Sequence, residues 1–320
     1  MKKLLLAAAA LALAPSAAET SQPAPASAET QPAQAQPAPA AVPDVDPAIW
    51  VVRDEDTTIY LFGTFHLLDG RRDWFNDEVR TAFDSSSELV IEMIAPGDAA
   101  EVQQIVAGYA RAADGQLLSR RLPAELNGQV QEKLAAIGIP AEQLDRMDPW
   151  FVGNLLSVIE LQKLGFAGEH GVETVLTAAA RERGMRLGEV ETFRGQLEMF
   201  DTLPEALQVA QLEQTIEMLD RLGEVMEPLL TSWSNGDTDT FATLMNDGMD
   251  EHPELYRLLL SNRNANWAEW IEQRMAQPGT VFMAVGAGHL GGRDSVQDFL
   301  ARRGLRSERV AAEGAVQPAA

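Results

Sequence analysis

The chain has 320 residues, a formal net charge of −23, a hydrophobic fraction of 46% and no cysteine. This length is enough for one large or two modest domains with a sizeable core. The negative charge argues against nucleic acid or an anionic membrane as partner, because both bind basic surfaces. The lack of cysteine excludes disulfides, thiolate metal sites and a cysteine nucleophile.

The first residues follow the pattern of a secretory signal peptide. Met1-Lys2-Lys3 is a positive start, Leu4–Leu13 is an apolar run, and Ser16-Ala17-Ala18 provides small residues for cleavage. The apolar run is too short to span a bilayer comfortably. We therefore expect residues 1–18 to be removed, leaving no integral membrane segment, and the mature protein to be periplasmic or secreted.

The next segment, residues 19–47, is rich in Pro, Ala, Gln and Ser and has almost no large apolar residue. Such a segment cannot bury enough surface to offset the entropy of ordering it. We expect a disordered tether there, a single folded domain over residues 48–312, and a disordered tail over 313–320.

Strand patterns occur near both ends of this domain. Two apolar runs, Ile49–Val52 and Thr57–Phe62, flank a polar turn and predict a hairpin. A helical pattern through residues 74–83 and a third apolar run, Leu89–Met93, suggest a right-handed crossover to a parallel neighbour. Near the other end, Gly279–Val285 predicts a strand that returns to the sheet, and Arg309-Val310 an edge strand.

The region of about 97–277 has mainly helical patterns. Pro123 and Asp148-Pro149 mark helix starts, and the longest pattern runs over Leu203–Leu230. One short strand is predicted at Met185–Glu191. The expected fold is α/β with a helical insertion: a mixed, largely parallel central sheet built from both ends of the chain and covered by a large helical block.

Two of the four histidines end the same motif. Gly63-Thr64-Phe65-His66 and Gly286-Ala287-Gly288-His289 each follow an apolar strand pattern. Open α/β sheets bind ligands at the carboxyl ends of their strands. We therefore expect His66 and His289 to meet at one edge of the sheet.

Two glutamates, Glu92 and Glu191, lie at or near the ends of predicted strands, and Glu189 is a third candidate. Two imidazoles and a carboxylate suit a divalent metal such as manganese, cobalt or zinc, which would activate a bound water. We predict His66, His289 and Glu92 as metal ligands. Without a metal, the same groups could form a histidine base oriented by a carboxylate. Arg263 could hold a carboxylate or an oxyanion.

Several segments together resemble the TraB/PrgY/GumN family, which is related to the Tiki proteases. They are Tyr60–Leu68, Glu92, Pro149-Trp150, Gly188–Thr192, Arg263-Asn264 and Ala284–Leu290. The resemblance implies a fold like that of erythromycin esterases and ChaN-type proteins. It also implies a centre of His66, His289 and Glu92, with Glu191 and Arg263 as further catalytic residues. The family more often has Leu before Glu-Thr, where this chain has Val190.

Three functions remain open from the sequence. The first is a metal-dependent hydrolase, expected to be a peptidase acting on a peptide or small exported substrate. The second is a non-catalytic periplasmic binder of a peptide signal or of haem. The third is a metal-free hydrolase of the esterase type.

Overall fold

The computed structural model describes residues 42–246, 249 and 252–311 of the chain. The expected signal peptide, most of the expected tether and the expected tail at 313–320 lie outside these residues. The last part of the expected tether belongs to the fold, because the Val45 and Asp46 amides donate to the Asp73 and Ser234 carbonyls at 3.1 and 2.9 Å.

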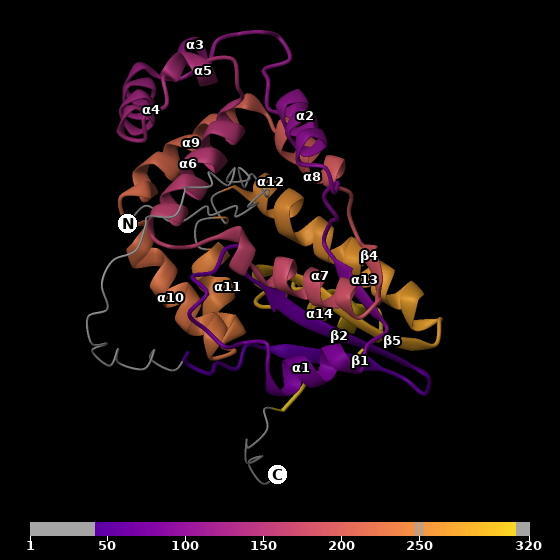
Figure 1. The fold of residues 1–320 in the computed structure, drawn as a ribbon. Coiled ribbons are helices and arrows are strands. Elements are labelled where there is room, and N and C mark those ends of the chain that lie inside the picture. The colour runs from indigo at the N-terminus through magenta and orange to yellow at the C-terminus, as the bar shows by residue number, and fades with distance from the viewer. Residues whose placement is uncertain (1–41, 247–248, 250–251, 312–320) are drawn as a thin grey trace, which may run out of the picture.

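One six-stranded sheet organises the domain (Figure 1), in the order β4-β3-β5-β2-β1-β6. The strands are β1 (Ile49–Arg53), β2 (Thr57–Thr64), β3 (Glu88–Ile91), β4 (Arg186–Glu189), β5 (Gly279–Gly286) and β6 (Ser307–Arg309). The four strands from β4 to β2 are parallel, whereas β1 pairs antiparallel with β2 and β6. The expected hairpin, edge strand and largely parallel sheet are confirmed.

The expected neighbour relation of β2 and β3 needs a correction. The two strands are parallel, but β5 lies between them and pairs with both. β5 begins more than two hundred residues after β2 ends, and it occupies the centre of the sheet. Its register with β2 is continuous from Thr57↔Gly279 to Thr64↔Gly286, so the two glycine-histidine motifs begin side by side.

Both faces of the sheet are covered, which explains why its strands are almost continuously apolar. Side chains alternate along β2: Ile59 and Leu61 pack with helices α13 (Asn262–Met275) and α14 (Val296–Arg302), whereas Phe62 faces the other side. That second side is covered by α1 (Asp77–Asp84), α7 (Val172–Glu182), α10 (Leu222–Ser234) and α11 (Thr238–Asn246).

The remaining helices form the predicted helical block. They are α2 (Ala99–Tyr109), α3 (Leu118–Arg121), α4 (Ala124–Ala136), α5 (Ala141–Leu144), α6 (Pro149–Lys163), α8 (Phe193–Asp201), α9 (Glu205–Leu219) and α12 (Pro253–Tyr256). Figure 1 shows α3, α4 and α5 at the end of the molecule opposite the strands. The pattern over Leu203–Leu230 is two helices, since the chain turns at Asp220 and Arg221 between α9 and α10. None of the described helices is long and apolar enough to cross a membrane.

Candidate functional site

The carboxyl ends of the parallel strands bring distant residues to one edge of the sheet. Glu92 directly follows β3, Glu191 lies two residues after β4, and His66 lies two residues after β2. His289 ends a 3-10 turn, η4 (Ala287–His289), that follows β5. Arg263 reaches the same place from the first turn of α13, just after a π-helical turn over Arg257–Ser261. Such π turns are frequent at functional sites.

The Arg263 guanidinium lies at the centre of this cluster. Its Nε donates to Glu191 Oε1 at 2.7 Å, and its Nη2 donates to Glu92 Oε2 at 2.6 Å and Glu191 Oε2 at 2.8 Å. Its Nη1 lies 3.2 Å from the Leu259 carbonyl and 3.2 Å from His289 Nε2. A guanidinium has five N–H groups, so every one has a protein acceptor. Arg263 therefore has no donor left for a bound oxyanion.

The two carboxylates are also nearly saturated. Glu92 accepts from Arg263 and Gln196 at Oε2 and from the Gly286 amide at Oε1, 2.7 Å away. Glycine at 286 leaves room for this bond, since a Cβ there would make a tight contact of 3.0 Å with that oxygen. Burial alone would raise the pKa of Glu92, but the charge of Arg263 outweighs it and holds the pKa far below its usual range. Glu92 is therefore ionised at neutral pH, with one lone pair left at Oε1.

Glu191 makes four hydrogen bonds. Besides Arg263, its oxygens accept from the Trp267 indole at 3.0 Å and from Gln196 Nε2 at 2.8 Å. Four bonds fill the capacity of a carboxylate. Glu189 does not join the cluster, because its Oε2 accepts from the Ile94 amide at 2.7 Å. Of the two candidate glutamates on this strand, the structure brings Glu191 to the centre.

His289 is buried and has partners at both ring nitrogens. Its Nδ1 lies 2.6 Å from Asn264 Oδ1, while Asn264 Nδ2 donates to the Asp294 carbonyl at 2.7 Å. This orientation of the amide requires a proton on His289 Nδ1, so Nε2 accepts from Arg263. Burial, together with the charge of Arg263, lowers the pKa of His289 to about 3. The ring is neutral at neutral pH.

His66 is in the opposite state. Its Nδ1 lies 2.5 Å from Glu173 Oε1, and the Thr64 hydroxyl donates to the same oxygen. Burial alone would lower the pKa of His66, but the Glu173 carboxylate outweighs this and raises it to about 9. The side chain keeps 29% exposure, and Nε2 has no hydrogen bond to any described residue. His66 is therefore an imidazolium with one N–H available.

The start of α7 holds Glu173 against His66. The Val172 amide donates to the Phe65 carbonyl at 3.1 Å. Gly171 lies so close to the loop after β2 that a Cβ at residue 171 would be 2.1 Å from the His66 carbonyl oxygen. This contact is possible only for glycine, and it places the first turn of α7 directly beside the histidine loop.

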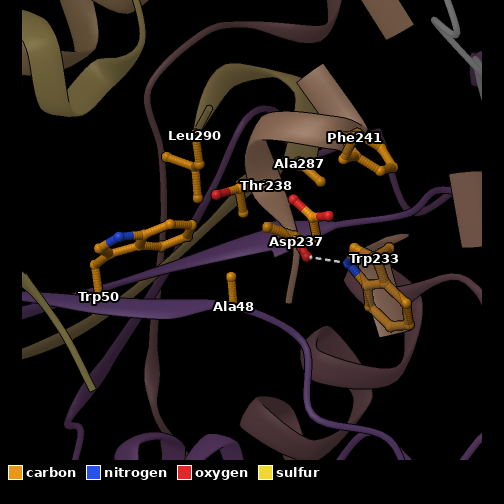
Figure 2. A pocket seen from close by; sticks show the side chains of 9 residues that line it. Ala48, Trp50, Trp233, Asp237, Thr238, Phe241, Ala287 and Leu290 are labelled. Carbon is orange, nitrogen blue, oxygen red and sulfur yellow. Dashed lines mark hydrogen bonds between the residues drawn. The ribbon is translucent and has the colours of Figure 1, made fainter. Parts of the chain in front are cut away.

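A small cavity borders the two glycine-histidine motifs at Gly63 and Ala287 (Figure 2). Its volume is about 10 Å³, the scale of one water molecule. Trp233 borders it and donates its indole N–H to the Gly63 carbonyl at 2.9 Å. Residues from α10, α11, β1 and both motifs form its wall: Ala48, Trp50, Gly63, Trp233, Asp237, Thr238, Phe241, Ala287 and Leu290. Its size indicates a support for the two turns and excludes a substrate pocket.

The structure thus brings together five of the residues that the sequence indicated, leaves the alternative Glu189 outside, and adds four. The five are His66, Glu92, Glu191, Arg263 and His289; the four are Asn264, Glu173, Gln196 and Trp267. His170 is outside the cluster, with 45% of its side chain exposed. A glutamate or a glutamine in the first turn of a helix is common, so Glu173 and Gln196 carried no signal of chemistry by themselves.

The predicted metal ligands do not fit a shared divalent ion in this arrangement. Among the described residues, three or more potential donor atoms come close together only at Asp44, Asp46 and Asp77, which are exposed and outside the cluster. The ligand atoms of His66, Glu92 and His289 do not converge in this way, and Arg263 neutralises the carboxylate instead. The metal site stays a prediction.

Comparison with known proteins agrees with the family resemblance. The model of the TraB/PrgY/gumN family matches residues 48–309. The uncharacterized protein YbaP of Escherichia coli K12 is 22% identical over 254 residues, covering 79% of this chain and 92% of YbaP. An uncharacterized protein of Treponema pallidum is 24% identical over 273 residues, covering 80% of each chain. No solved structure matches. The family match spans most of the chain, which therefore belongs to the TraB/PrgY/gumN family.

Proposed function

We propose that this protein is a hydrolase that cleaves an ester or amide bond, with His66 as its catalytic acid. The observation that supports this most is the pairing of His66 with Glu173 while its second ring nitrogen stays available. A histidine oriented by a carboxylate at one nitrogen and open at the other is a common arrangement for proton transfer.

The hydrogen-bond capacities of the cluster favour this assignment. Arg263, Glu191 and His289 are committed to protein partners. Of the five residues that the sequence indicated for the centre, only His66 at Nε2 and Glu92 at one lone pair of Oε1 retain capacity toward a substrate. His66 and Glu92 are close enough for each charge to shift the pKa of the other. A pair with pKa values pushed apart is typical of acid–base catalysis.

The proposed reaction adds water to the carbonyl carbon of the substrate. Glu92 Oε1 accepts a hydrogen bond from the attacking water and orients it. His66 Nε2–H donates first to the carbonyl oxygen and then gives its proton to the leaving alcohol or amine. The water supplies the hydroxyl of the acid product, and its second proton passes directly to the neutral His66 Nε2, which restores the imidazolium. Arg263 keeps Glu92 ionised and in place throughout.

The pH dependence of hydrolysis tests this role. With p-nitrophenyl acetate and a quenched peptide library as probes, we expect kcat/KM of the wild type to fall as the pH rises through about 9, because His66 then loses its proton. In Glu173→Gln the fall should begin at a lower pH. His66→Gln should lose about 10²-fold or more. The control His170→Ala should behave like the wild type. Activity that instead rises through pH 9 would contradict the acid role.

A metal-dependent hydrolase, expected to be a peptidase, is the second candidate, and one observation favours it. Both histidines are held at Nδ1 by protein oxygens, from Glu173 and Asn264, which is how metal-binding histidines are oriented. This candidate requires Arg263 to move away from Glu92. Elemental analysis of chelator-free protein separates the two candidates, since only the second predicts manganese, cobalt or zinc near one per chain.

We also propose export to the periplasm, which the signal-like start of the sequence supports. The substrate would then be a peptide or small molecule of that compartment. The intact mass of the exported protein should match a chain that begins near Glu19. A chain that keeps Met1 and is found in the membrane fraction would contradict export. Absence of hydrolysis combined with a haem absorption band would favour a binding protein.

A further inference from the structure

Gln196 makes an unusual pair of contacts in the centre. Its side-chain Nε2 donates to Glu92 Oε2 at 3.0 Å and to Glu191 Oε2 at 2.8 Å. These are the same two oxygens that Arg263 Nη2 binds, at 2.6 and 2.8 Å. Two donors and two acceptors therefore close a four-membered ring of hydrogen bonds. An NH₂ group has two protons, so the amide is fully used here.

This ring acts on the position of the Glu92 carboxylate. With Oε2 held by two donors and Oε1 held by the Gly286 amide, the carboxylate cannot rotate, and its remaining lone pair keeps one direction. Without Gln196, Arg263 alone would hold two like charges that repel each other across the space left by the amide. Glu92 could then turn or take up water at Oε2.

The local fold fixes Gln196 relative to Glu191. Thr192 caps α8, its hydroxyl accepting from the Gly195 amide at 3.0 Å, and the Gln196 amide donates to the Thr192 carbonyl at 3.1 Å. The capped turn begins directly after Glu191, so both side chains leave one short, hydrogen-bonded segment. Gln196 is buried, with 9% exposure.

We infer that Gln196 is a positioning residue, which fixes Glu92 and Glu191 on Arg263 so that the free lone pair of Glu92 faces the reacting water. The inference rests on the proposed hydrolase function. It predicts that the two N–H groups of Gln196, rather than its volume, are what the centre requires.

Two substitutions separate these properties. Gln196→Ala removes both the shape and the donors, whereas Gln196→Glu keeps the shape and replaces the donors with a third carboxylate. Gln208→Ala is the matched control: Gln208 is also buried in a helix, but its Nε2 donates to the Leu203 carbonyl, away from the centre. We expect both Gln196 variants to lose about 10- to 100-fold in kcat on p-nitrophenyl acetate, with KM changed less than about twofold.

A second readout does not depend on activity. The Arg263 Nε–H is bound to Glu191 and should give a slowly exchanging proton signal in ¹⁵N-labelled wild type and in Gln208→Ala. In Gln196→Ala and Gln196→Glu this signal should exchange about tenfold faster or more. If it stays as protected as in the wild type, the inference is wrong. It is also wrong if Gln196→Glu keeps wild-type kcat. If the Gln196 variants lose protection but the wild type hydrolyses neither probe, the ring is retained and the proposed function is rejected.

Discussion

The ion pair between His66 and Glu173 should make the stability of the fold depend on pH. His66 has a raised pKa, from an ordinary 6.5 to about 9, so the folded state holds its proton more tightly than the unfolded state. The pair therefore stabilises the fold fully below pH 6.5, and this contribution is lost as the pH rises through about 9. A pKa difference of about 2.5 between the folded and unfolded states corresponds to at most about 3.4 kcal/mol.

Solvent screening reduces this value, because the two side chains keep 29% and 19% exposure. We expect about 1–3 kcal/mol. The perturbation is Glu173→Gln, which removes the charge and keeps the shape. Urea unfolding of the wild type and the variant at pH 6 and pH 9.5 gives the variant's loss of unfolding free energy at each pH. When the two losses are compared, the contributions of the other titrating groups cancel. The variant should be less stable at pH 6, and this deficit should shrink by about 1–3 kcal/mol at pH 9.5.

Glu182→Gln is the matched control, since Glu182 lies on the same helix as Glu173, is exposed and has no ion pair to a described residue. Its effect should be the same at both pH values. The reasoning would be refuted if the Glu173→Gln deficit did not change with pH. An NMR titration of His66 with a midpoint at or below 6.5 in the wild type would refute it independently.

Three further predictions concern the supports of the centre. Arg263→Leu leaves the buried Glu92 without its counter-charge and should cost about 3–5 kcal/mol of unfolding free energy in urea. Arg257 is exposed, so the control Arg257→Leu should cost less than about 0.5 kcal/mol. A loss below about 1 kcal/mol for Arg263→Leu would contradict the burial of the Glu92 charge. Trp233→Phe removes the donor to the Gly63 carbonyl and should cost about 1–2 kcal/mol by calorimetry, and no loss would contradict that bond. Manganese, cobalt or zinc should not raise the melting temperature; an ion at about 100 times its Kd that stabilised the fold by about 2.7 kcal/mol would favour the metal-dependent candidate.

Local patterns were sufficient to predict the fold class and the strands of the sheet, but not the full strand order. Strands β2 and β5 are largely apolar and have glycine as the last or the next-to-last residue, so their type and the place of His66 and His289 followed from the local pattern. The largely parallel sheet and the helical block are confirmed. The adjacency of β5 to β2 was implied only by the repeated motif, and its position between β2 and β3 was not predicted.

The tertiary structure decided what each site residue does. Sequence shows that Arg263, Glu92 and Glu191 are present, but the number of partners each one has depends on which side chains the fold places around it. Gln196 and Glu173 lie on separate helices, so their contacts with Glu92 and His66 exist only after the sheet has closed. Burial and neighbouring charge then give the two histidines opposite protonation states, although both end the same motif. Identical local sequence patterns cannot encode that difference, because the pKa of a side chain is set by the charges and solvent around it in the folded protein.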